Sequence, residues 1–489
     1  MRLLVQIAVC GGVFITVCLG QQVQEPSWAR DAIFYQIFPE RFANGDTTND
    51  PPDVQPWGGK PMYNNYFGGD LQGIIDHLDY LQTLGINAIY MTPIFESPTN
   101  HKYQTIDYLK IDPHFGDEKL FHRLIDECHK RGLRVVIDGV FNHTSVKFFA
   151  FDDLKKNGKN SQYTSWYNVH SYPVSGSDKP NYDGWWGHGD LPKLMTDTPA
   201  VRTYLFNVTK HWTEAGIDGW RVDAAEQISH DFWNNWRTVV KKENPNAFII
   251  GEIWTDASAW LAGDEFDAVM NYPFRGSLVG YVALENRNAR QFDSILVDQQ
   301  HRYAPAVVEV LQNLIGSHDT ERFLTLCKGD IDKLKTAVLV QMTYPGAPMI
   351  YYGDEIGMTG GKDPDCRKTM IWDQQQWNMD LFHWYQRMIK IRKTYDVFRN
   401  GSYSTAFVDS ATNSVGYWRA SDSAQALVVI NGSAQQNNYS LAIKSTFPTK
   451  WINLVDDKEY NVRADSIEGL SLGAHSAAVL VPAVREMRR

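Results

Sequence analysis

Several features that define whole classes of protein are scarce in these 489 residues. Five cysteines occur, and two of them, Cys10 and Cys18, lie within the first twenty residues. The others, Cys128, Cys327 and Cys366, are an odd set without paired spacing, which excludes a disulfide scaffold. Cysteine and histidine also never cluster with the ligand spacing of a zinc site.

Basic residues are fewer than acidic residues. The chain has 47 Lys and Arg against 57 Asp and Glu, for a formal net charge of −10. An acidic surface repels phosphate backbones and no local basic patch interrupts it, so nucleic acid is not expected as a partner. Repeats and low-complexity segments are missing, and the composition is that of an ordinary globular protein long enough for roughly three domains.

Long hydrophobic runs are confined to the N-terminus. Arg2 precedes an apolar run from Leu3 to Leu19, followed by the small residue Gly20 and then polar residues. This is the pattern of a secretory signal peptide over residues 1–20, so we expect a secreted or periplasmic protein without a membrane span once the signal is removed. An uncleaved anchor remains an alternative, because the run is close to the ~20 residues that cross a bilayer.

From Ser27 to about Lys393, short apolar runs of β type alternate with amphipathic helical stretches. Eight strands with helices between them predict a (β/α)₈ barrel. The expected strands are Phe34–Phe38, Ile86–Pro93, Leu133–Val140, Asp218–Asp223, Phe248–Trp254, Phe266–Tyr272, Val310–Ser317 and Pro348–Asp354.

The barrel is interrupted once and followed by a second domain. A polar, aromatic and Gly-rich stretch over 144–198 predicts a small inserted domain after the third strand, which divides the barrel into residues 21–143 and 199–395. Short alternating strands between Ser, Asn and Gly turns predict an all-β C-terminal sandwich over 396–489.

Three carboxylates follow expected barrel strands: Asp223, Glu252 and Asp319. Strand C-terminal ends gather around one mouth of such a barrel, and the sequence spacing of these residues is compatible with one or two βα units. Three convergent carboxylates predict cleavage of a glycosidic bond: one attacks the anomeric carbon, one protonates the leaving oxygen and one steadies the developing positive charge.

The neighbours of these acids suggest how the roles divide. Arg221 shares side-chain parity with Asp223 and should keep it ionised, as a nucleophile requires. Glu252 follows an apolar Phe-Ile-Ile-Gly run that favours the protonated form of a general acid. Asp319 adjoins His318, whose imidazole can hydrogen-bond a sugar hydroxyl.

Four blocks around these residues resemble, in order and context, the signature regions of the α-amylase superfamily of glycoside hydrolases. They are Asp138-Gly-Val-Phe-Asn-His143, Gly219-Trp-Arg-Val-Asp223, Gly251-Glu-Ile-Trp254 and Ile315-Gly-Ser-His-Asp319. The resemblance implies a retaining mechanism with Asp223 as nucleophile, Glu252 as acid/base and Asp319 as transition-state stabiliser. It further implies that the attacked sugar lies among Tyr103, His143, Arg221 and His318, with Asp138 supporting the network.

Three stretches are similar to the neopullulanase, cyclomaltodextrinase and maltogenic amylase group within that superfamily. They are Leu191-Pro-Lys-Leu194, Phe266-Asp-Ala-Val-Met-Asn-Tyr-Pro273 and Asp363-Pro-Asp-Cys-Arg367. This likeness implies that Asp365 and Arg367 contact sugars on the non-reducing side and that Trp254 stacks on the leaving-group side. A structural salt bridge is the alternative for Asp365 and Arg367.

The chain also departs from that group. It is expected to enter the barrel directly after the signal, without the N-terminal domain that the group usually carries. Ala224-Ala-Glu-Gln227 replaces the usual segment after the nucleophile, Gln104 stands where Asp is common, and Met195 stands where Asn or Arg is usual. These changes leave the chemistry intact and leave open the preferred bond and acceptor.

An oxygen-rich cluster follows the first expected strand, and its side chains and backbone carbonyl suit a hard Ca²⁺ ion. A solvated turn is the alternative from composition alone, but the spacing resembles the calcium loop of the neopullulanase group. The ligands implied for a structural Ca²⁺ are Asn44, Asp46, Asn49, Asp50, Gly68 and Asp70.

The sequence therefore predicts a retaining hydrolase of α-1,4-glucosidic bonds that acts on maltooligosaccharides, cyclodextrins, pullulan or starch. Cleavage of α-1,6 bonds remains open, as does the oligomeric state. The alternatives are a general secreted starch-degrading α-amylase, a transglycosylase, and a catalytically silent sugar-binding relative. Such relatives typically lose one of the acids, and here all three are present.

Overall fold

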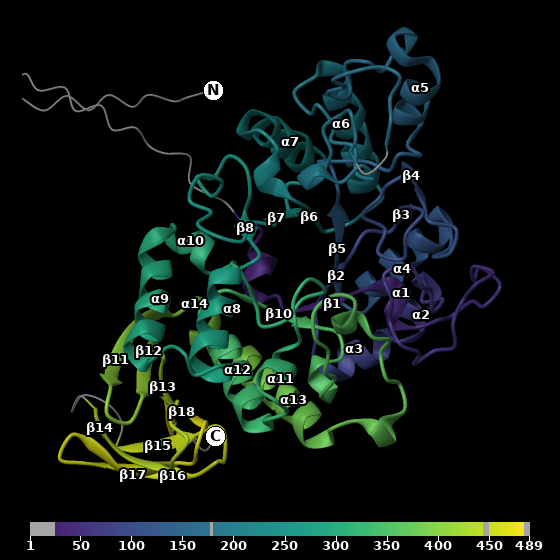
Figure 1. Cartoon of the computed structure of the whole chain (residues 1–489). Helices are drawn as coiled ribbons and strands as arrows, with labels where there is room; N and C mark the ends of the chain where they lie inside the picture. Colours follow the sequence, from purple (N-terminus) through teal and green to yellow (C-terminus); the bar gives the residue numbers. More distant parts are fainter. Residues whose placement is uncertain (1–24, 177–178, 444–448, 484–489) are drawn as a thin grey trace, which may run out of the picture.

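A closed barrel of parallel strands forms the centre of the molecule (Figure 1). The computed structural model describes residues 25–176, 179–443 and 449–483, so the expected signal peptide lies outside the described residues. Eight strands within those ranges pair in the order β8-β7-β6-β5-β2-β1-β10-β9, and a parallel bridge between Met270 and Gln312 joins β8 to β9. The predicted (β/α)₈ barrel is confirmed. Its strands are β1 (Phe34–Ile37), β2 (Ala88–Met91), β5 (Arg134–Gly139), β6 (Gly219–Val222), β7 (Phe248–Gly251), β8 (Ala268–Val269), β9 (Gln312–Leu314) and β10 (Ala347–Tyr351).

Helices surround the sheet because each connection between parallel strands must cross its outer face. Asp117 caps the helix Glu118–Lys130, which buries Phe121, Leu124, Ile125 and Cys128. The helices are α1 (Pro39–Phe42), α2 (Leu71–Asp76), α3 (Leu78–Leu84), α4 (Glu118–Lys130), α5 (Phe149–Asn157), α6 (Pro199–Glu214), α7 (His230–Glu243), α8 (Tyr272–Leu278), α9 (Ala289–Arg302), α10 (Pro305–Val308), α11 (Phe323–Leu326), α12 (Ile331–Thr343), α13 (Met379–Thr394) and α14 (Val397–Asn400).

Side-chain alternation along the strands separates two cores. Phe248 and Ile250 of β7 belong to the small apolar cluster inside the barrel, whereas Ile249 packs outward against the helix layer. Because side chains alternate between the two faces of a strand, Val136 and Asp138 of β5 both point into the barrel. Polar residues at the upper ends of the strands are thereby directed to the barrel mouth.

Each observed strand is shorter than the apolar run that predicted it. The run Phe248–Trp254 forms a strand only as far as Gly251, and the run Asp218–Asp223 ends its strand at Val222. The residues beyond these ends no longer pair with neighbouring strands and line the open end of the barrel. Asp223 and Glu252 therefore lie immediately after β6 and β7.

Two excursions from the barrel build the walls of the mouth. The hairpin of β3 (Phe95–Glu96) and β4 (Asp107–Ile111) follows β2 and carries the segment with Tyr103. The insertion after β5 contains α5 and is held by isolated antiparallel bridges, including one from His143 to Lys193.

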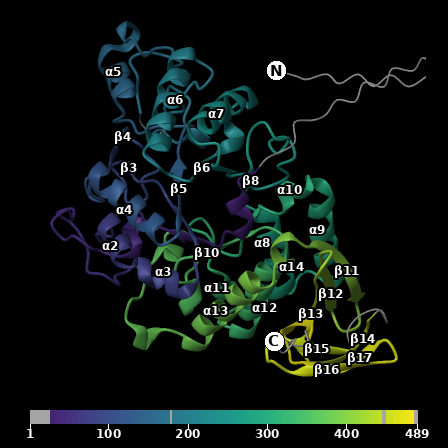
Figure 2. The same ribbon diagram turned by 180° about the vertical axis from the view of Figure 1, so that it is seen from behind.

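The C-terminal domain is all-β, as predicted, and its strands pair antiparallel in the order β11-β12-β13-β18-β15-β16-β17-β14. Figures 1 and 2 both place it beside α9 and α12, at the end of the molecule away from α5. The strands are β11 (Ser402–Asp409), β12 (Ser414–Ala420), β13 (Gln425–Asn431), β14 (Asn437–Ala442), β15 (Lys450–Asn453), β16 (Glu459–Arg463), β17 (Ser466–Leu472) and β18 (Ala477–Pro482).

Buried arginines fasten this domain to the barrel. Arg419 of β12 donates hydrogen bonds to the carbonyl oxygens of Thr343, Phe398 and Gly401, and Arg392 of α13 donates to those of Met342 and Phe398. Burial lowers the pKa of Arg392 to about 9 and that of Arg419 to about 10.

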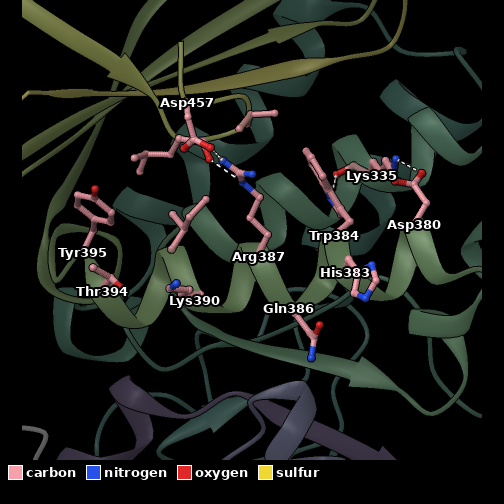
Figure 3. Close-up of a pocket in the computed structure, with 13 residues that line it drawn as sticks. Lys335, Asp380, His383, Trp384, Gln386, Arg387, Lys390, Thr394, Tyr395 and Asp457 are labelled. Atoms are coloured by element: carbon pink, nitrogen blue, oxygen red, sulfur yellow. Dashed lines mark hydrogen bonds and ion pairs between the residues drawn. The ribbon is translucent and has the colours of Figure 1, made fainter. Parts of the chain in front are cut away.

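A groove along α13 marks the outer side of the same junction (Figure 3). Arg387 of α13 pairs with Asp457 at 2.8 Å and donates to the carbonyl of Leu454, while Lys335 of α12 pairs with Asp380. The charged groups of the groove thus hold helices and domain together. No helix within the described ranges combines the length and apolarity needed to cross a bilayer.

A buried carboxyl at the end of β10 yields a stability prediction. Glu355 accepts hydrogen bonds from the hydroxyls of Tyr35 and Tyr80, with no cation bonded to it among the described residues, and burial raises its pKa to about 7. The folded state therefore keeps this proton while the unfolded state loses it near pH 4.5. Stability from Glu355 is complete below pH 4.5 and declines as the pH rises to about 7.

Glu355→Gln removes this titration. Between pH 5 and pH 8 the unchanged protein should lose about 2–3 kcal/mol of unfolding free energy relative to the variant, as measured by urea unfolding followed by tryptophan fluorescence. Parallel pH profiles for the two proteins would contradict the assignment.

Candidate active site

One guanidinium organises the barrel mouth. Arg221 of β6 is fully buried, and its Nη1 donates to both carboxylate oxygens of Asp138 at 2.9 Å and to Asp223 at 3.1 Å. Its Nη2 lies 3.0 Å from Oε2 of Glu252. Because parity directs Asp138 and Arg221 inward, the carboxylates following β6 and β7 meet the cation that the strand itself supplies.

The electrostatics of this cluster differ from the sequence expectation. Burial and the negative charge of Glu252 raise the pKa of Asp223 well above its usual range, and Arg221 opposes that rise without cancelling it. Burial likewise raises the pKa of Asp138 to about 6. Three carboxylates share the positive charge of Arg221, so that charge only partly offsets the rise in the pKa of Asp223.

The loop after β9 brings Asp319 to the opposite wall. Oδ1 of Asp319 pairs with Arg367 at 3.0 Å, and Oδ2 lies 3.0 Å from Nε2 of His318. Burial, followed by the charge of Arg367, lowers the pKa of His318 well below its usual value. A neutral imidazole thus faces the cavity beside an exposed carboxylate oxygen.

Tyr103 connects the two walls. Its hydroxyl lies 2.9 Å from Oδ2 of Asp138 and 2.7 Å from Nε2 of His318, and its ring is parallel to that of His318 with centroids 5.4 Å apart. Nε2 of His143 lies 3.2 Å from the carbonyl oxygen of Tyr103, and burial lowers the pKa of His143 to about 4. The segment from the β3–β4 hairpin is thereby fixed over the floor of the mouth.

The Glu252 side of the mouth has an aromatic edge. The indole Nε1 of Trp254 donates to Oε1 of Glu252 at 3.1 Å, and the backbone N–H of Ala224 donates to Oε2 at 3.0 Å. The Trp254 ring stacks on Tyr272 with centroids 3.6 Å apart, yet Trp254 remains 42% exposed. The Glu252 carboxylate is thus oriented at the edge of an exposed aromatic ring.

These groups surround a cavity of about 710 Å³, large enough for several sugar rings. Nine of the ten candidate catalytic and sugar-binding residues line it or the floor beneath it. The lining includes Tyr103, His143, Asp223, Glu252, Trp254, His318, Asp319 and Arg367, with Arg221 buried below.

Asp365 is the exception. Its side chain accepts a hydrogen bond from the backbone N–H of Gly361 at 2.6 Å and lies 3.3 Å from Nζ of Lys368. Asp363 lines the cavity instead and pairs with Arg367 at 3.1 Å. The geometry gives the sugar-contacting role of Asp365 no support.

Several lining residues were missed from the sequence. Trp185 stacks on His143 with centroids 5.4 Å apart, and Trp186 stacks on Trp185 at 5.1 Å. Tyr63, from the loop between α1 and α2, also reaches the cavity. A cluster of aromatics within polar, Gly-rich loops is the signal that could have identified them.

The candidate cation loop gathers its predicted residues beside α2. Nδ2 of Asn44 donates to Asp50 at 2.8 Å, while the Asp70 carboxylate accepts from the backbone N–H groups of Asp46 and Gly73, capping α2. Side-chain oxygens Oδ1 of Asn44 and Asn49 are buried without a hydrogen-bond partner among the described residues.

The loop closes tightly at Gly68. A Cβ at Gly68, whose φ is +84°, would lie 2.2 Å from a carboxylate oxygen of Asp50, so only glycine allows the approach. Among the described residues no three His, Cys, Asp or Glu side chains form a metal-binding group. A cation would therefore depend on the two unpaired amide oxygens as well as on Asp46 and Asp50. The Asp70 carboxylate already accepts hydrogen bonds from backbone N–H groups.

Comparison with known proteins places the chain among carbohydrate-active enzymes. Residues 36–401 match the model of the α-amylase catalytic domain. The chain is 48% identical over 416 residues to a cyclomaltodextrinase of Thermoanaerobacter pseudethanolicus, covering 84% of this chain and 72% of that protein. It is 43% identical over 458 residues to neopullulanase 2 of Thermoactinomyces vulgaris, covering 93% and 78%.

Solved structures give the same result. A cyclomaltodextrinase superposes with a TM-score of 0.90 at 43% identity, covering 94% of this chain and 79% of that one. A cyclic α-maltosyl-(1→6)-maltose hydrolase from Arthrobacter globiformis superposes with a TM-score of 0.87 at 37% identity, covering 94% and 100%.

Proposed function

This chain belongs to the α-amylase family of glycoside hydrolases, and we propose that it cleaves α-1,4-glucosidic bonds of cyclodextrins and short maltooligosaccharides with retention of configuration. The observation that carries the proposal is the single guanidinium of Arg221 shared by Asp223 and Glu252. Sharing one guanidinium brings the two carboxylates near each other, and a short separation favours a covalent glycosyl intermediate over direct inversion.

In the first step, Asp223 attacks the anomeric carbon while Glu252 donates its proton to the departing glycosidic oxygen. Attack requires the ionised form of Asp223, although burial and the charge of Glu252 raise its pKa, so substrate binding must favour that ionised form. The indole of Trp254, bonded to Glu252, lies where the leaving sugar stacks. In the second step, Glu252 takes a proton from the water that releases the sugar.

The remaining groups stabilise the charge between these steps. Asp319 presents a carboxylate oxygen toward the oxocarbenium-like ring, and Arg367 fixes its orientation. Neutral His318 lines the cavity and holds the Tyr103 hydroxyl through Nε2, and the parallel ring of Tyr103 can stack beneath the sugar. Together these contacts bind the distorted ring more tightly than the relaxed one.

Relatives named cyclomaltodextrinase, neopullulanase and maltogenic α-amylase support the preference for small or cyclic glucans. Neopullulanase 2, at 43% identity, also supports some action on pullulan. These names give no support to the alternative of a general secreted starch amylase. Transfer of the glycosyl group to a sugar instead of water uses the same intermediate and remains a second outcome of the same site.

Two further proposals concern the state of the protein. From the Arg2 and Leu3–Leu19 pattern we propose export to the periplasm or the medium. From the unpaired oxygens of Asn44 and Asn49 we propose a structural Ca²⁺ held by the loop of Asn44, Asp46, Asn49, Asp50 and Gly68. When bound, that ion would supply positive charge that orders the loop.

The catalytic roles predict distinct losses. Asp223→Asn and Glu252→Gln should each lower kcat on maltotriose by at least about 10²-fold, with unchanged circular dichroism, because no other group can take over either step. On 4-nitrophenyl α-maltoside, whose leaving group needs little protonation, Glu252→Gln should still release one equivalent of nitrophenol and Asp223→Asn none. Retention of more than about a tenth of kcat on maltotriose by either variant would refute the roles.

Metal removal tests the calcium loop. A ligand that binds only the folded state stabilises it by about 2.7 kcal/mol at a hundredfold excess over its Kd, so EDTA should lower the melting temperature and CaCl₂ should restore it. Asn49→Ala should abolish the response to EDTA. An identical melting curve in EDTA, with no calcium in elemental analysis, would refute the site.

Substrate preference is decided by competition at equal bond concentration. We expect kcat/KM for β-cyclodextrin and maltotriose to exceed that for soluble starch, because the named relatives act on small or cyclic glucans. Product analysis by chromatography, with pullulan as a further substrate, reports both cleavage and transfer. A higher kcat/KM for starch would overturn the preference.

A further inference from the structure

Tyr63 combines high exposure with a fixed position. It is 67% exposed, yet it lines the same cavity as Asp223 and Glu252. A single exposed aromatic ring on a protein surface needs no explanation, but one at the rim of a sugar-sized cavity offers a flat apolar face where substrate must pass. Its value as a binding surface depends on whether hydrogen bonds fix the position of the Tyr63 ring.

The backbone that carries Tyr63 is pinned from below. Asn100, only 3% exposed, donates from Nδ2 to the carbonyl oxygens of Tyr63 at 3.1 Å and of Asn65 at 2.8 Å. Asn65 in turn accepts from the backbone N–H of Met62 and donates to the carbonyl of Lys60. A buried amide is thus committed to holding a surface loop in one conformation.

The side chain is tethered as well. The hydroxyl of Tyr63 donates to the carbonyl oxygen of Asp363 at 3.0 Å. The Asp363 carboxylate pairs with Arg367 at 3.1 Å, and Arg367 pairs with Asp319 at 3.0 Å. The ring is therefore positioned relative to the stabilising carboxylate by three consecutive polar contacts.

These contacts also assign a side of the cleaved bond. The acid Glu252 and its neighbour Trp254 mark the side of the leaving group, whereas Tyr63 is joined to the wall that carries Asp319. We propose that Tyr63 is a specificity-determining platform that stacks on a glucose unit of the glycone, beyond the unit attacked by Asp223. The inference rests on the proposed function and makes the site favour substrates with more than one sugar on that side.

The physical basis is preorganisation. The C–H face of a pyranose is apolar, and stacking on a ring whose backbone and hydroxyl are already fixed loses little conformational entropy on binding. A contact of this kind typically contributes about three- to tenfold in affinity. Because Tyr63 is remote from the reacting atoms, its contribution should appear in KM more than in kcat.

The experiment varies only the glycone. With 4-nitrophenyl α-glucoside and 4-nitrophenyl α-maltotrioside the leaving group is identical, so nitrophenol release separates contacts on the two sides. Tyr63→Ala should lower kcat/KM on the maltotrioside about three- to tenfold, mainly through KM, and leave the glucoside within about twofold. Tyr63→Phe keeps the ring without its tether and serves as the matched control, retaining at least half of the maltotrioside value.

Each result decides the matter. An equal loss on both substrates, or no loss on the maltotrioside, overturns the platform. Failure of the unchanged protein to cleave either compound would count against the proposed function rather than against Tyr63. In that event titration calorimetry with maltotriose decides: binding at least threefold weaker in Tyr63→Ala supports the platform, and equal binding refutes it.

Discussion

The active site depends on one buried positive charge that three carboxylates share. Among the residues that the structure describes, Arg221 is the cation that pairs with Asp138, Asp223 and Glu252, so the cluster carries more negative than positive charge inside a closed barrel. Burying uncompensated charge is costly, and the least expensive remedy is to retain a proton. The raised pKa values of Asp138 and Asp223 express this requirement. Charge balance within the barrel thus favours the protonated form of these two carboxyls.

Much of the barrel and its chemistry could be predicted from the sequence because both rest on periodicity. Apolar runs separated by helical stretches located all eight strands, and strand ends located Asp223, Glu252 and Asp319. The prediction that Arg221 keeps Asp223 ionised failed because it considered one strand only. Parity correctly related Arg221 to Asp223, but charge competition from Glu252 is a contact across strands that one strand's sequence does not contain.

Loop residues were the least predictable part of the site. Asp365 and Asp363 differ by two positions in one short loop, and only its folded path decides that Asp363 faces the cavity. The hairpin β3–β4 was not anticipated either, since its strands are short and weakly patterned. Function in this fold is therefore divided: rigid strand ends fix the reacting groups, while aromatic rings on the loops, such as Trp185, determine which sugars approach them.

Arg392 and Arg419 limit where this protein can be divided into separate domains. Arg392 belongs to the last long helix around the barrel and Arg419 to the β domain, and both donate to the carbonyl of Phe398 in the short connection between them. Cutting the chain in this connection and separating the parts would take the Phe398 carbonyl from one of the two arginines and the Thr343 carbonyl from Arg419. The C-terminal domain and the barrel are consequently not independent modules. A chimera that exchanges the domain with that of a relative would have to include α13, the connection and β12 from the same protein.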